Sequence, residues 1–413
     1  MRRHSTGTQR RARLGRALLL AVAGWTWGGP ASAAICGYVV NEGDDSVSVV
    51  DLTTRTVLRV VPVGEQPSAV AITHTDAQGT VALVTNRAGH SLSILSLDQG
   101  MSLPSVSLTE DPTAIAASAD GIAYVVHPAT STLTVVDVAR LTGTVQSVPG
   151  RPIAVALAPS AGAVLMVDAS ANHLLVRDDG NPALVSTYRV GAMPSAIAFD
   201  PSTGLAYVAG NPMAIFDPMR PDVTGQFSPP VGTVTAIAVD TDRAALVVAV
   251  QDEAGGTVSI VHTADLSGPR ERIDLGANVD PTAIAVDPTD GAMALVTDHA
   301  NDQLLLVDLD EGTVSHIATG HQPVALAVAE IADSTCWPTP VEPTATPTPL
   351  GRTCAGDCDG DGAVAINELI LGVSIALGGS IASQCPALDS NSDSQVAIAE
   401  LIAAVGSALN GCG

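Results

Sequence analysis

A short apolar run recurs seven times along the chain, about every 40 residues. Most of the runs begin with proline, and they read PSAVAI at 67, PTAIAA at 112, PIAVAL at 152, PSAIAF at 194, VTAIAV at 234, PTAIAV at 281 and PVALAV at 323. After each of the first six come a turn with acidic or glycine residues, a second apolar run, a polar loop and two more strand-like runs. Four short strands in a repeat of this length are typical of one blade of a β-propeller. The pattern therefore predicts an all-β fold.

The two ends of the array determine the number of blades. Residues 38–41, 46–51 and 57–63 read as three strands that precede the first inner strand, whereas no strands follow the run at 323. The unpaired inner strand at 323 can complete the blade formed by the three N-terminal strands. Closure of the ring removes the free sheet edges that promote aggregation. We therefore expect a seven-bladed β-propeller of four-stranded blades, closed by the N- and C-terminal strands.

Two cysteines flank this composite blade. Cys36 lies just before its first N-terminal strand, and Cys336 lies just after the last strand of the array. We predict a disulfide between them, with Cα atoms within about 7 Å of each other. Closing a loop of roughly 300 residues contributes at most about 4–5 kcal/mol in the chain-entropy model.

One family carries the same repeat. The run Gly-Tyr-Val-Val-Asn at 37–41 and the strands that follow it, echoed at residues 81–97 and 294–309, resemble the YVTN-type seven-bladed propeller repeat over residues 37–329. The resemblance implies a binding or surface module. The repeat that begins at 194 departs from the pattern, because its loop reads as shortened at Gly210, Asn211 and Pro212.

The first 33 residues read as a secretory signal peptide. Six arginines precede the apolar run at residues 17–24, and small residues at 31–33 provide a cleavage site. The apolar run is too short to span a membrane. We therefore expect a secreted or cell-surface protein, with a propeller over residues 34–337, a Pro/Thr linker over 338–353 and a separate domain over 354–413.

Charge excludes several classes of partner. The six arginines of the leader account for part of the 18 basic residues, which leaves 12 against 42 acidic residues and a net charge near −30. Lysine is absent from the sequence, which excludes Schiff-base chemistry and P-loop phosphate binding. A chain this acidic is not expected to bind nucleic acid or anionic lipid. Six cysteines remain after cleavage, and an even number in an oxidising compartment indicates disulfides.

Two twelve-residue stretches of the tail alternate acidic and small residues. They read DCDGDGAVAINE from Asp357 and DSNSDSQVAIAE from Asp389. An EF-hand loop binds calcium through positions 1, 3, 5, 7, 9 and 12, with the main-chain carbonyl at 7 and often a water at 9. The expected protein ligands are Asp357, Asp359, Asp361, the Ala363 carbonyl and Glu368 in the first loop, and Asp389, Asn391, Asp393, the Gln395 carbonyl and Glu400 in the second. We therefore predict two Ca²⁺ sites. The second is expected to be weaker, because Ser394 replaces the turn glycine.

Each loop leads directly into a predicted helix, residues 366–377 and 398–409. This loop-and-helix unit, duplicated at an interval of 32 residues, resembles the dockerin module over residues 354–413. The resemblance implies a cohesin-like partner, although Ile366 and Ile398 depart from the commonest pattern beside the cohesin-contacting region. Cys354, Cys358, Cys385 and Cys412 allow three pairings, and we expect Cys412 to bond either Cys354 or Cys358.

Catalytic chemistry would have to lie at the end of the propeller formed by the loops between second and third strands and the loops that precede the inner strands. The candidates there are Arg87, His90, Arg151, His173, Asp298, His299 and His321. We interpret them as unconnected surface residues, and Asn41, Asn86, Asp168 and Asp298 as turn formers that cap local backbone. No GxSxG, HExxH or CxxCH motif occurs.

Two classes of function fit these observations. The first is a non-catalytic binding or scaffold protein, whose propeller binds an unidentified extracellular protein or glycan and whose tail binds calcium for attachment or assembly. The alternative is an extracellular hydrolase, either a lactonase-like propeller or a carbohydrate-active component of a dockerin-assembled complex for polysaccharide catabolism. The absence of a convergent acid–base group favours the first. We expect a monomer without a membrane span.

Overall fold

The computed structural model describes residues 33–109, 111–268, 270–289, 291–331, 335–338, 355–359, 363–377, 385–389 and 395–410 of the 413-residue chain. These residues form two compact units that divide between Trp337 and Pro338. The first unit contains the strands, and the second contains the helices α1 (Ile366–Ala376) and α2 (Ile398–Asn410) with the short 3₁₀ turn η4 (Pro386–Leu388).

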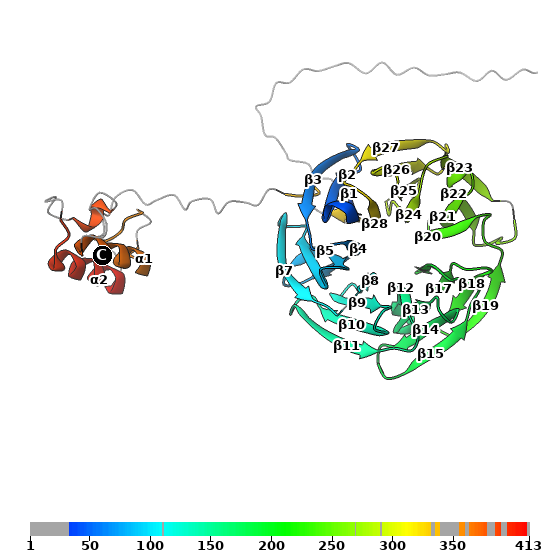
Figure 1. Cartoon of the computed structure of the whole chain (residues 1–413), viewed down its shortest axis with the longest axis horizontal. Helices are drawn as coiled ribbons and strands as arrows, with labels where there is room; N and C mark the ends of the chain where they lie inside the picture. Colours follow the sequence, from blue (N-terminus) through cyan, green and yellow to red (C-terminus); the bar gives the residue numbers. More distant parts are fainter. Residues whose placement is uncertain are drawn as a thin grey trace, which may run out of the picture. The chain divides into compact units, whose positions relative to one another are not determined.

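The first unit is a ring of seven four-stranded antiparallel sheets (Figure 1). Blade 1 joins the two ends of the array: β28 (Pro323–Ile331) is its inner strand, followed outward by β1 (Ala34–Asn41), β2 (Ser46–Asp51) and β3 (Thr56–Pro62). Tyr38 lies opposite Ala327 in the pairing of β1 with β28. The predicted seven-bladed fold and its closure by terminal strands are therefore confirmed.

The other six blades follow in chain order, each running from its inner strand to the rim. Blade 2 comprises β4 (Pro67–Thr75), β5 (Gly79–Asn86), β6 (Ser91–Ser96) and β7 (Met101–Ser107). Blade 3 comprises β8 (Ala114–Ala117), β9 (Ile122–His127), β10 (Thr132–Asp137) and β11 (Thr142–Ser147). Blade 4 comprises β12 (Pro152–Ala158), β13 (Ala163–Asp168), β14 (His173–Asp178) and β15 (Val185–Arg189).

Blade 5 comprises β16 (Ile197–Asp200), β17 (Leu205–Val208), β18 (Met213–Asp217) and β19 (Asp222–Phe227). Blade 6 comprises β20 (Thr233–Asp240), β21 (Ala245–Asp252), β22 (Gly255–His262) and β23 (Glu271–Gly276). Blade 7 comprises β24 (Pro281–Val286), β25 (Met293–Asp298), β26 (Gln303–Asp308) and β27 (Val314–Ala318).

The predicted shortening of the middle loop of blade 5 is confirmed by the strand pairing. Val208 of β17 pairs with Ala214 of β18, with five residues between them, whereas the equivalent Val84 of blade 2 pairs with Ser93, with eight between them. Blade 6 has a longer hairpin, because Val248 pairs with Ser259, but the pairing continues to Asp252 and Gly255 and leaves only residues 253–254 unpaired in the turn. Gly255 makes this turn possible: its φ is +131°, and a Cβ there would lie 2.1 Å from the Gly276 carbonyl oxygen.

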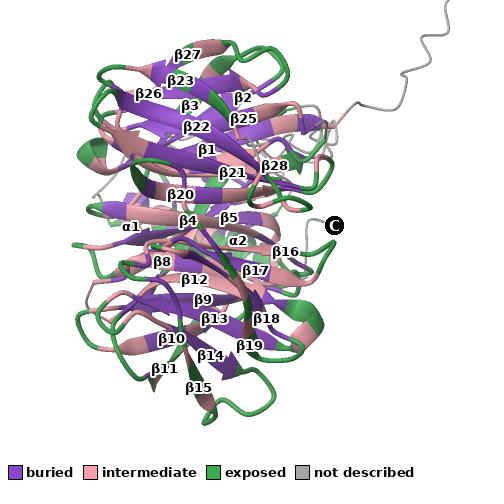
Figure 2. Ribbon diagram, turned by 90° about the vertical axis from the view of Figure 1, so that its right-hand side faces the viewer, coloured by how far each residue is buried: buried purple, intermediate pink, exposed green. Residues whose placement is uncertain are grey.

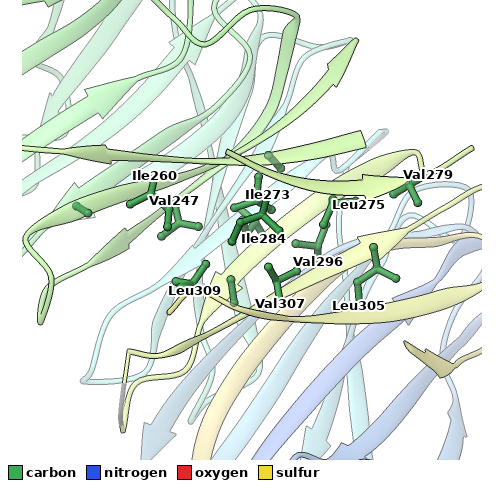
Figure 3. Packing of buried hydrophobic residues seen from close by; sticks show 14 residues of the cluster. Val247, Ile260, Ile273, Leu275, Val279, Ile284, Val296, Leu305, Val307 and Leu309 are labelled. Atoms are coloured by element: carbon green, nitrogen blue, oxygen red, sulfur yellow. The ribbon is translucent and has the colours of Figure 1, made fainter. Parts of the chain in front are cut away.

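The core consists of apolar clusters between neighbouring blades. Seven clusters of buried residues account for the seven blade interfaces, so the ring is packed all the way round. Figure 3 shows the cluster between blades 6 and 7, in which Val247 and Ile260 meet Ile284, Val296 and Leu305. Seen from the side, buried positions follow the strands, and exposed positions concentrate in the loops (Figure 2).

Both faces of each blade are buried, which explains the unbroken apolar runs. In β1, Tyr38 and Val40 pack toward blade 2, whereas Val39 packs toward blade 7. A strand covered on both faces needs apolar residues at successive positions rather than at alternate ones. The low aromatic content, 2% of the sequence, leaves Val, Leu, Ile and Ala to fill these interfaces.

The second residue of the repeated PSAVAI-type run links adjacent blades. The hydroxyl of Ser68 donates to the Pro112 carbonyl at 2.8 Å, and Thr282 donates to the Pro323 carbonyl at 3.0 Å. Ser195 makes the same bond to the Val234 carbonyl at 2.9 Å. The hydroxyl at this position thus links neighbouring blades at three of the seven interfaces.

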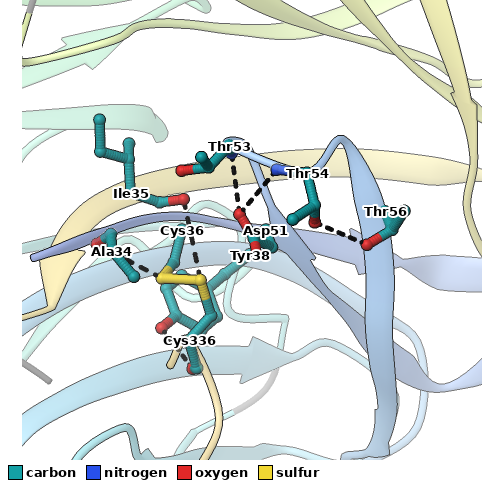
Figure 4. Close-up of a disulfide and its surroundings, with 9 residues drawn as sticks. All are labelled: Ala34, Ile35, Cys36, Tyr38, Asp51, Thr53, Thr54, Thr56 and Cys336. Atoms are coloured by element: carbon teal, nitrogen blue, oxygen red, sulfur yellow. Dashed lines mark hydrogen bonds between the residues drawn. A yellow bond between two sulfur atoms is a disulfide. The ribbon is translucent and has the colours of Figure 1, made fainter. Parts of the chain in front are cut away.

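The disulfide between Cys36 and Cys336 closes the ring covalently. Its Cα atoms lie 5.4 Å apart, which confirms the prediction. The Tyr38 hydroxyl donates to the Cys336 carbonyl at 3.1 Å, so the C-terminal end of the ring is held by two contacts (Figure 4).

Much of the acidic composition serves the turns. Asp51, Asp217 and Asp308 each accept backbone N–H groups from the residues two and three positions later. Asp200 and Asp240 do the same in the turns after two inner strands. An aspartate that caps its own turn stabilises the hairpin locally, which accounts for these charges without a ligand.

The second unit has a small core around Ile375, Cys385, Leu388, Val396 and Ala404. Helices α1 and α2 begin where predicted, at Ile366 and Ile398. Cys358 bonds Cys385, with Cα atoms 4.7 Å apart. The expected alternative of a Cys412 bond to Cys358 is therefore wrong, because Cys385 takes that thiol, and Cys354 and Cys412 lie outside the described residues.

Candidate metal centre and binding face

Three acidic residues of the first EF-hand-like loop converge. One carboxylate oxygen from each of Asp357, Asp359 and Glu368 lies within 4.8 Å of the other two. Asp357 is 9% exposed and Glu368 only 4%. Ionised carboxylates at this separation repel one another, and partial burial strengthens the repulsion. A cation at their centre would remove it.

Backbone donors fix the position of Glu368. Its Oε1 accepts the N–H groups of Cys358 at 2.6 Å and of Asp359 at 3.3 Å, while its Oε2 accepts that of Ala365 at 2.7 Å. These bonds hold Glu368, the last expected ligand of the loop, close to Asp357 and Asp359. The bond to Ala365 also caps the start of α1. Ala363, the predicted carbonyl ligand, is described, whereas Asp361 lies outside the described residues.

The second loop repeats part of this arrangement. Glu400 is 7% exposed, and its Oε2 accepts the Ala397 N–H at 2.9 Å, as Glu368 does with Ala365. Asp389 and Gln395 are described, whereas Asn391 and Asp393 are not. Val364 and Val396, which occupy position 8 of the two loops, are both buried. Within the described residues, the convergent group of three ligands occurs in the first loop.

On the propeller we distinguish two kinds of loop at one end of the ring. The middle loops join second and third strands, and the lead-in loops precede inner strands. Since blades are antiparallel, both kinds lie at the same end, which we call the loop face. Arg87, His90, Arg151, His299 and His321 lie on these loops, with His173 and Asp298 at adjoining strand ends.

The loop-face histidines and arginines have separate partners. Arg87 pairs with Glu42 at 2.9 Å, and His321 contacts Asp302 at 2.9 Å. The Gln322 N–H and, less strongly, His321 lower the pKa of Asp302 below its usual value. Within the described residues, no hydrogen bond or ion pair joins His90, His299 or His321 to Arg87 or Arg151. The structure therefore does not assemble a histidine–arginine group from them.

Polar residues at the ends of second strands hold the loop face together. Asp168 accepts the N–H and the hydroxyl of Ser170, which confirms its local capping role, and it also accepts the Arg151 N–H of the lead-in loop. Asp298 accepts the N–H of Asp280, eighteen positions earlier, so it caps the lead-in loop rather than local backbone. Burial raises the pKa of Asp168, but the hydrogen bonds from Ser170 and Arg151 outweigh it, so the pKa falls below 3.8.

Two of the predicted backbone caps act differently. Asn41 donates from Nδ2 to the hydroxyls of Ser46 and Ser48, and Asn86 donates to those of Ser91 and Ser93. These amides bridge to the third strand rather than to local backbone. The reason is that the serines occupy the facing positions of β2 and β6, within 3.1 Å of each amide nitrogen.

Glycines in the lead-in loops pack directly on these polar residues. A Cβ on Gly64 would lie 2.6 Å from the Asn86 amide nitrogen, and one on Gly150 would lie 2.0 Å from an Asp168 carboxylate oxygen. The loop face of these blades is therefore closely packed, and no ligand is needed to explain its polar residues.

No protein-family model matches the chain, and no curated protein matches it in sequence. Solved structures do resemble it. A functionally unknown protein from Desulfotomaculum acetoxidans DSM 771 has a TM-score of 0.61 at 18% identity, over 72% of this chain and 99% of that one. A protein from Lactobacillus plantarum has a TM-score of 0.57 at 17% identity, over 72% and 100%. Virginiamycin B lyase from Staphylococcus aureus has a TM-score of 0.53 at 16% identity, over 65% and 92%. At these identities the similarity shows the propeller fold alone.

Two features bear on the cellular compartment. The two disulfides found within the described residues suggest an extracellular, oxidising environment. None of the described helices is long and apolar enough to cross a membrane.

Proposed function

We propose that this is a secreted, non-catalytic binding protein of the YVTN-type propeller class, with a dockerin-like tail that binds two calcium ions. The observation that carries the proposal is the convergence of Asp357, Asp359 and Glu368 at positions 1, 3 and 12 of an EF-hand spacing. The propeller is the binding platform, and the tail is the attachment module.

The donor set fits calcium better than a transition metal. All the predicted ligands are oxygens, which suit hard cations such as Ca²⁺, and position 12 is a glutamate able to bind through both oxygens. The cysteine nearest the cluster, Cys358, is in a disulfide and therefore offers no thiolate. The first site is expected to be the stronger one, since Asp359 and Gly362 stand where the second loop has Asn391 and Ser394.

The helices of the tail support an attachment role. Each exposes a stripe of large apolar residues at helical spacing, Ile366, Ile370, Val373 and Leu377 beside α1 and Ile398, Ile402, Val405 and Leu409 in α2. The two stripes are related by the same 32-residue interval as the calcium loops. Such a surface is costly to leave in water, which favours a protein partner of the cohesin type.

The hydrolase alternative has weaker support. The described residues of the loop face do not bring together a nucleophile, a base and an oxyanion donor, and the candidate histidines have separate partners. We therefore propose one function.

Calorimetric titration of the full chain with Ca²⁺ tests the proposal. Two binding events are expected, of which Asp357→Ala removes the stronger and Asp389→Ala the weaker. Asp217→Ala, which alters a propeller turn cap, is the matched control and is expected to leave both unchanged. Absence of calcium heat at millimolar ion, or an equal loss from both tail variants, would contradict the proposal or its ranking.

A further inference from the structure

One sector of the loop face lacks the packing described above. The polar residue at the end of the second strand, represented by Asn86 in blade 2, is replaced by Gly210 in blade 5 and by Val250 in blade 6. Blade 5 also has the shortened middle loop, with five residues between the paired Val208 and Ala214. Two consecutive blades thus lack the polar residue that ties the lead-in loop down, and the first of them also has a shorter middle loop.

A hollow opens at this place. One part, about 170 Å³, is lined by residues that include Met193, Ser195, Asn211 and Pro229. A second, more open part of about 820 Å³ is lined by residues that include Val231, Gln251, Glu253 and Arg272. Gly232 and Thr233 line both parts, so the two form one continuous surface, which we call the blade 5–6 hollow.

The walls of the hollow are unusually apolar for a loop surface. Val231 is 82% exposed and Met193 is 77% exposed. Among the described large hydrophobic residues of the propeller, these two are the most exposed, and both line the same hollow. Pro229 lines the first part together with Met193. Exposed apolar side chains that line one concave surface indicate a binding site, because they pack against nothing in the protein itself.

The polar groups of the hollow favour a ligand that carries a hydrogen-bond donor and a positive charge. The Oε1 of Gln251 is buried and accepts no hydrogen bond, which leaves it open to an N–H donor. Arg272 pairs with Asp252 at 2.7 Å, so Glu253 remains as an exposed carboxylate without an ion pair among the described residues. The backbone N–H of Ala254 and the Arg272 guanidinium lower the pKa of Asp252, which keeps it ionised.

We infer that the blade 5–6 hollow binds an extended basic peptide segment, with an apolar side chain against Met193 and Val231 and a lysine or arginine beside Glu253. An extended peptide supplies both the alternating side chains and the N–H donors that this surface requires. The large negative charge of the protein favours a basic ligand over an acidic one. A glycan fits less well, because no aromatic ring lines either part of the hollow. The inference names the ligand class for the platform in the proposed function, and it rests on that function.

Fluorescence anisotropy with three labelled nonapeptides tests the inference on the full-length, calcium-loaded protein at physiological salt. The probes are (Lys-Leu-Ser)₃, (Glu-Leu-Ser)₃ with reversed charge, and (Lys-Gly-Ser)₃ without apolar side chains. The first is expected to bind about tenfold or more tightly than the other two, since burial of leucine and the charge contact both contribute.

Variants locate the binding. Val231→Asp and Met193→Asp are expected to weaken (Lys-Leu-Ser)₃ binding about tenfold or more, and Glu253→Gln a few-fold. Met219→Asp is the matched control: Met219 is 62% exposed at the opposite end of blade 5, in the turn between β18 and β19, and its replacement should change the affinity less than twofold. All four positions are exposed or at a loop, and thermal melts establish that each variant is folded.

The inference would be overturned if no peptide bound, or if the lysine peptides bound equally well with and without leucine. It would also be overturned if Met193→Asp and Met219→Asp lost the same peptide affinity, or if cellohexaose bound at Val231 in place of the peptide. Each of these leaves the calcium titration unaffected. A negative result with the peptides is therefore distinguishable from failure of the proposed function, because the calcium titration tests that function separately.

Discussion

The propeller and the tail module differ in how far they cover their apolar residues. In the propeller, seven apolar clusters fill the blade interfaces, and buried carboxylates such as Asp168 and Asp298 accept hydrogen bonds within the loop face. In the tail, Glu368 and Glu400 are buried, whereas Ile366 and Leu409 are more than three-quarters exposed. The propeller buries most of its large apolar side chains, and the tail helices leave a stripe of theirs exposed.

This difference follows from size. A ring of some 300 residues buries enough aliphatic surface to fold by packing, whereas a unit of about 60 residues cannot and needs cross-links or metal ions. In the tail, the disulfide between Cys358 and Cys385 and the convergent carboxylates of the first loop fill that need. The helices are then left with apolar faces that pack on nothing within the described part of their own unit.

Removal of calcium should produce the largest difference in stability between the two units. Chelation with EDTA is expected to unfold or loosen residues 354–413, because Asp357, Asp359 and Glu368 then repel one another, while residues 34–335 stay folded. Hydrogen exchange should rise at least about tenfold in α1 and α2 and remain unchanged in the blades. Protection of both helices that is equal with and without EDTA would show that the tail folds without the ion.

Loss of the ring-closing disulfide should destabilise only the propeller. The double variant Cys36→Ser, Cys336→Ser is expected to lower the free energy of unfolding of the propeller by about 2–5 kcal/mol, because it frees a very long loop in the unfolded chain. Denaturant unfolding measures the change. Cys358→Ser, Cys385→Ser is the control, which should leave the propeller transition in place and broaden that of the tail.

A buried carboxylate of the loop face gives a smaller, pH-dependent effect. Asp168→Asn is expected to cost about 1–2 kcal/mol at pH 7, because the carboxylate accepts several hydrogen bonds. The pKa of Asp168 is lower in the folded state than its ordinary value of 3.8. The stabilisation is therefore complete at pH values above the ordinary pKa, and it is lost as the pH falls through the pKa of the folded state. The difference between the two proteins should therefore shrink below pH 4. A difference that stays constant to pH 2 would contradict the role of the charge.

Replacing the loop-face histidines should have the smallest effect. The triple variant His90→Ala, His299→Ala, His321→Ala is expected to change stability by less than about 1 kcal/mol, since the contact of His321 with Asp302 is exposed. Thermal melts and the peptide titration check this, with Asp298→Ala as the destabilising comparison because Asp298 is fully buried. A large loss of binding in the triple variant would restore these histidines as functional residues.

Repeated features of the chain were predictable and isolated ones were not. The ring, its closure and the bond from Cys36 to Cys336 follow from the recurrence of one strand pattern and from its two incomplete ends. The shortened loop at Gly210 was also predictable, because it interrupts a spacing that the other repeats share. The extended hairpin of blade 6 was not, since its turn at residues 253–254 depends on Gly255 adopting a φ that only glycine reaches easily.

The local pattern of the sequence determined the strands, the blades and the spacing of the calcium ligands, because each depends on residues close together in the chain. Tertiary structure decided which groups meet. It paired Cys358 with Cys385, gave Asn41 and Asn86 serine partners, and brought Met193 and Val231 from neighbouring blades to one hollow. Met193 and Val231 lie about 40 residues apart in the lead-in loops of two successive blades, and only the packing of those blades against each other brings the two loops together.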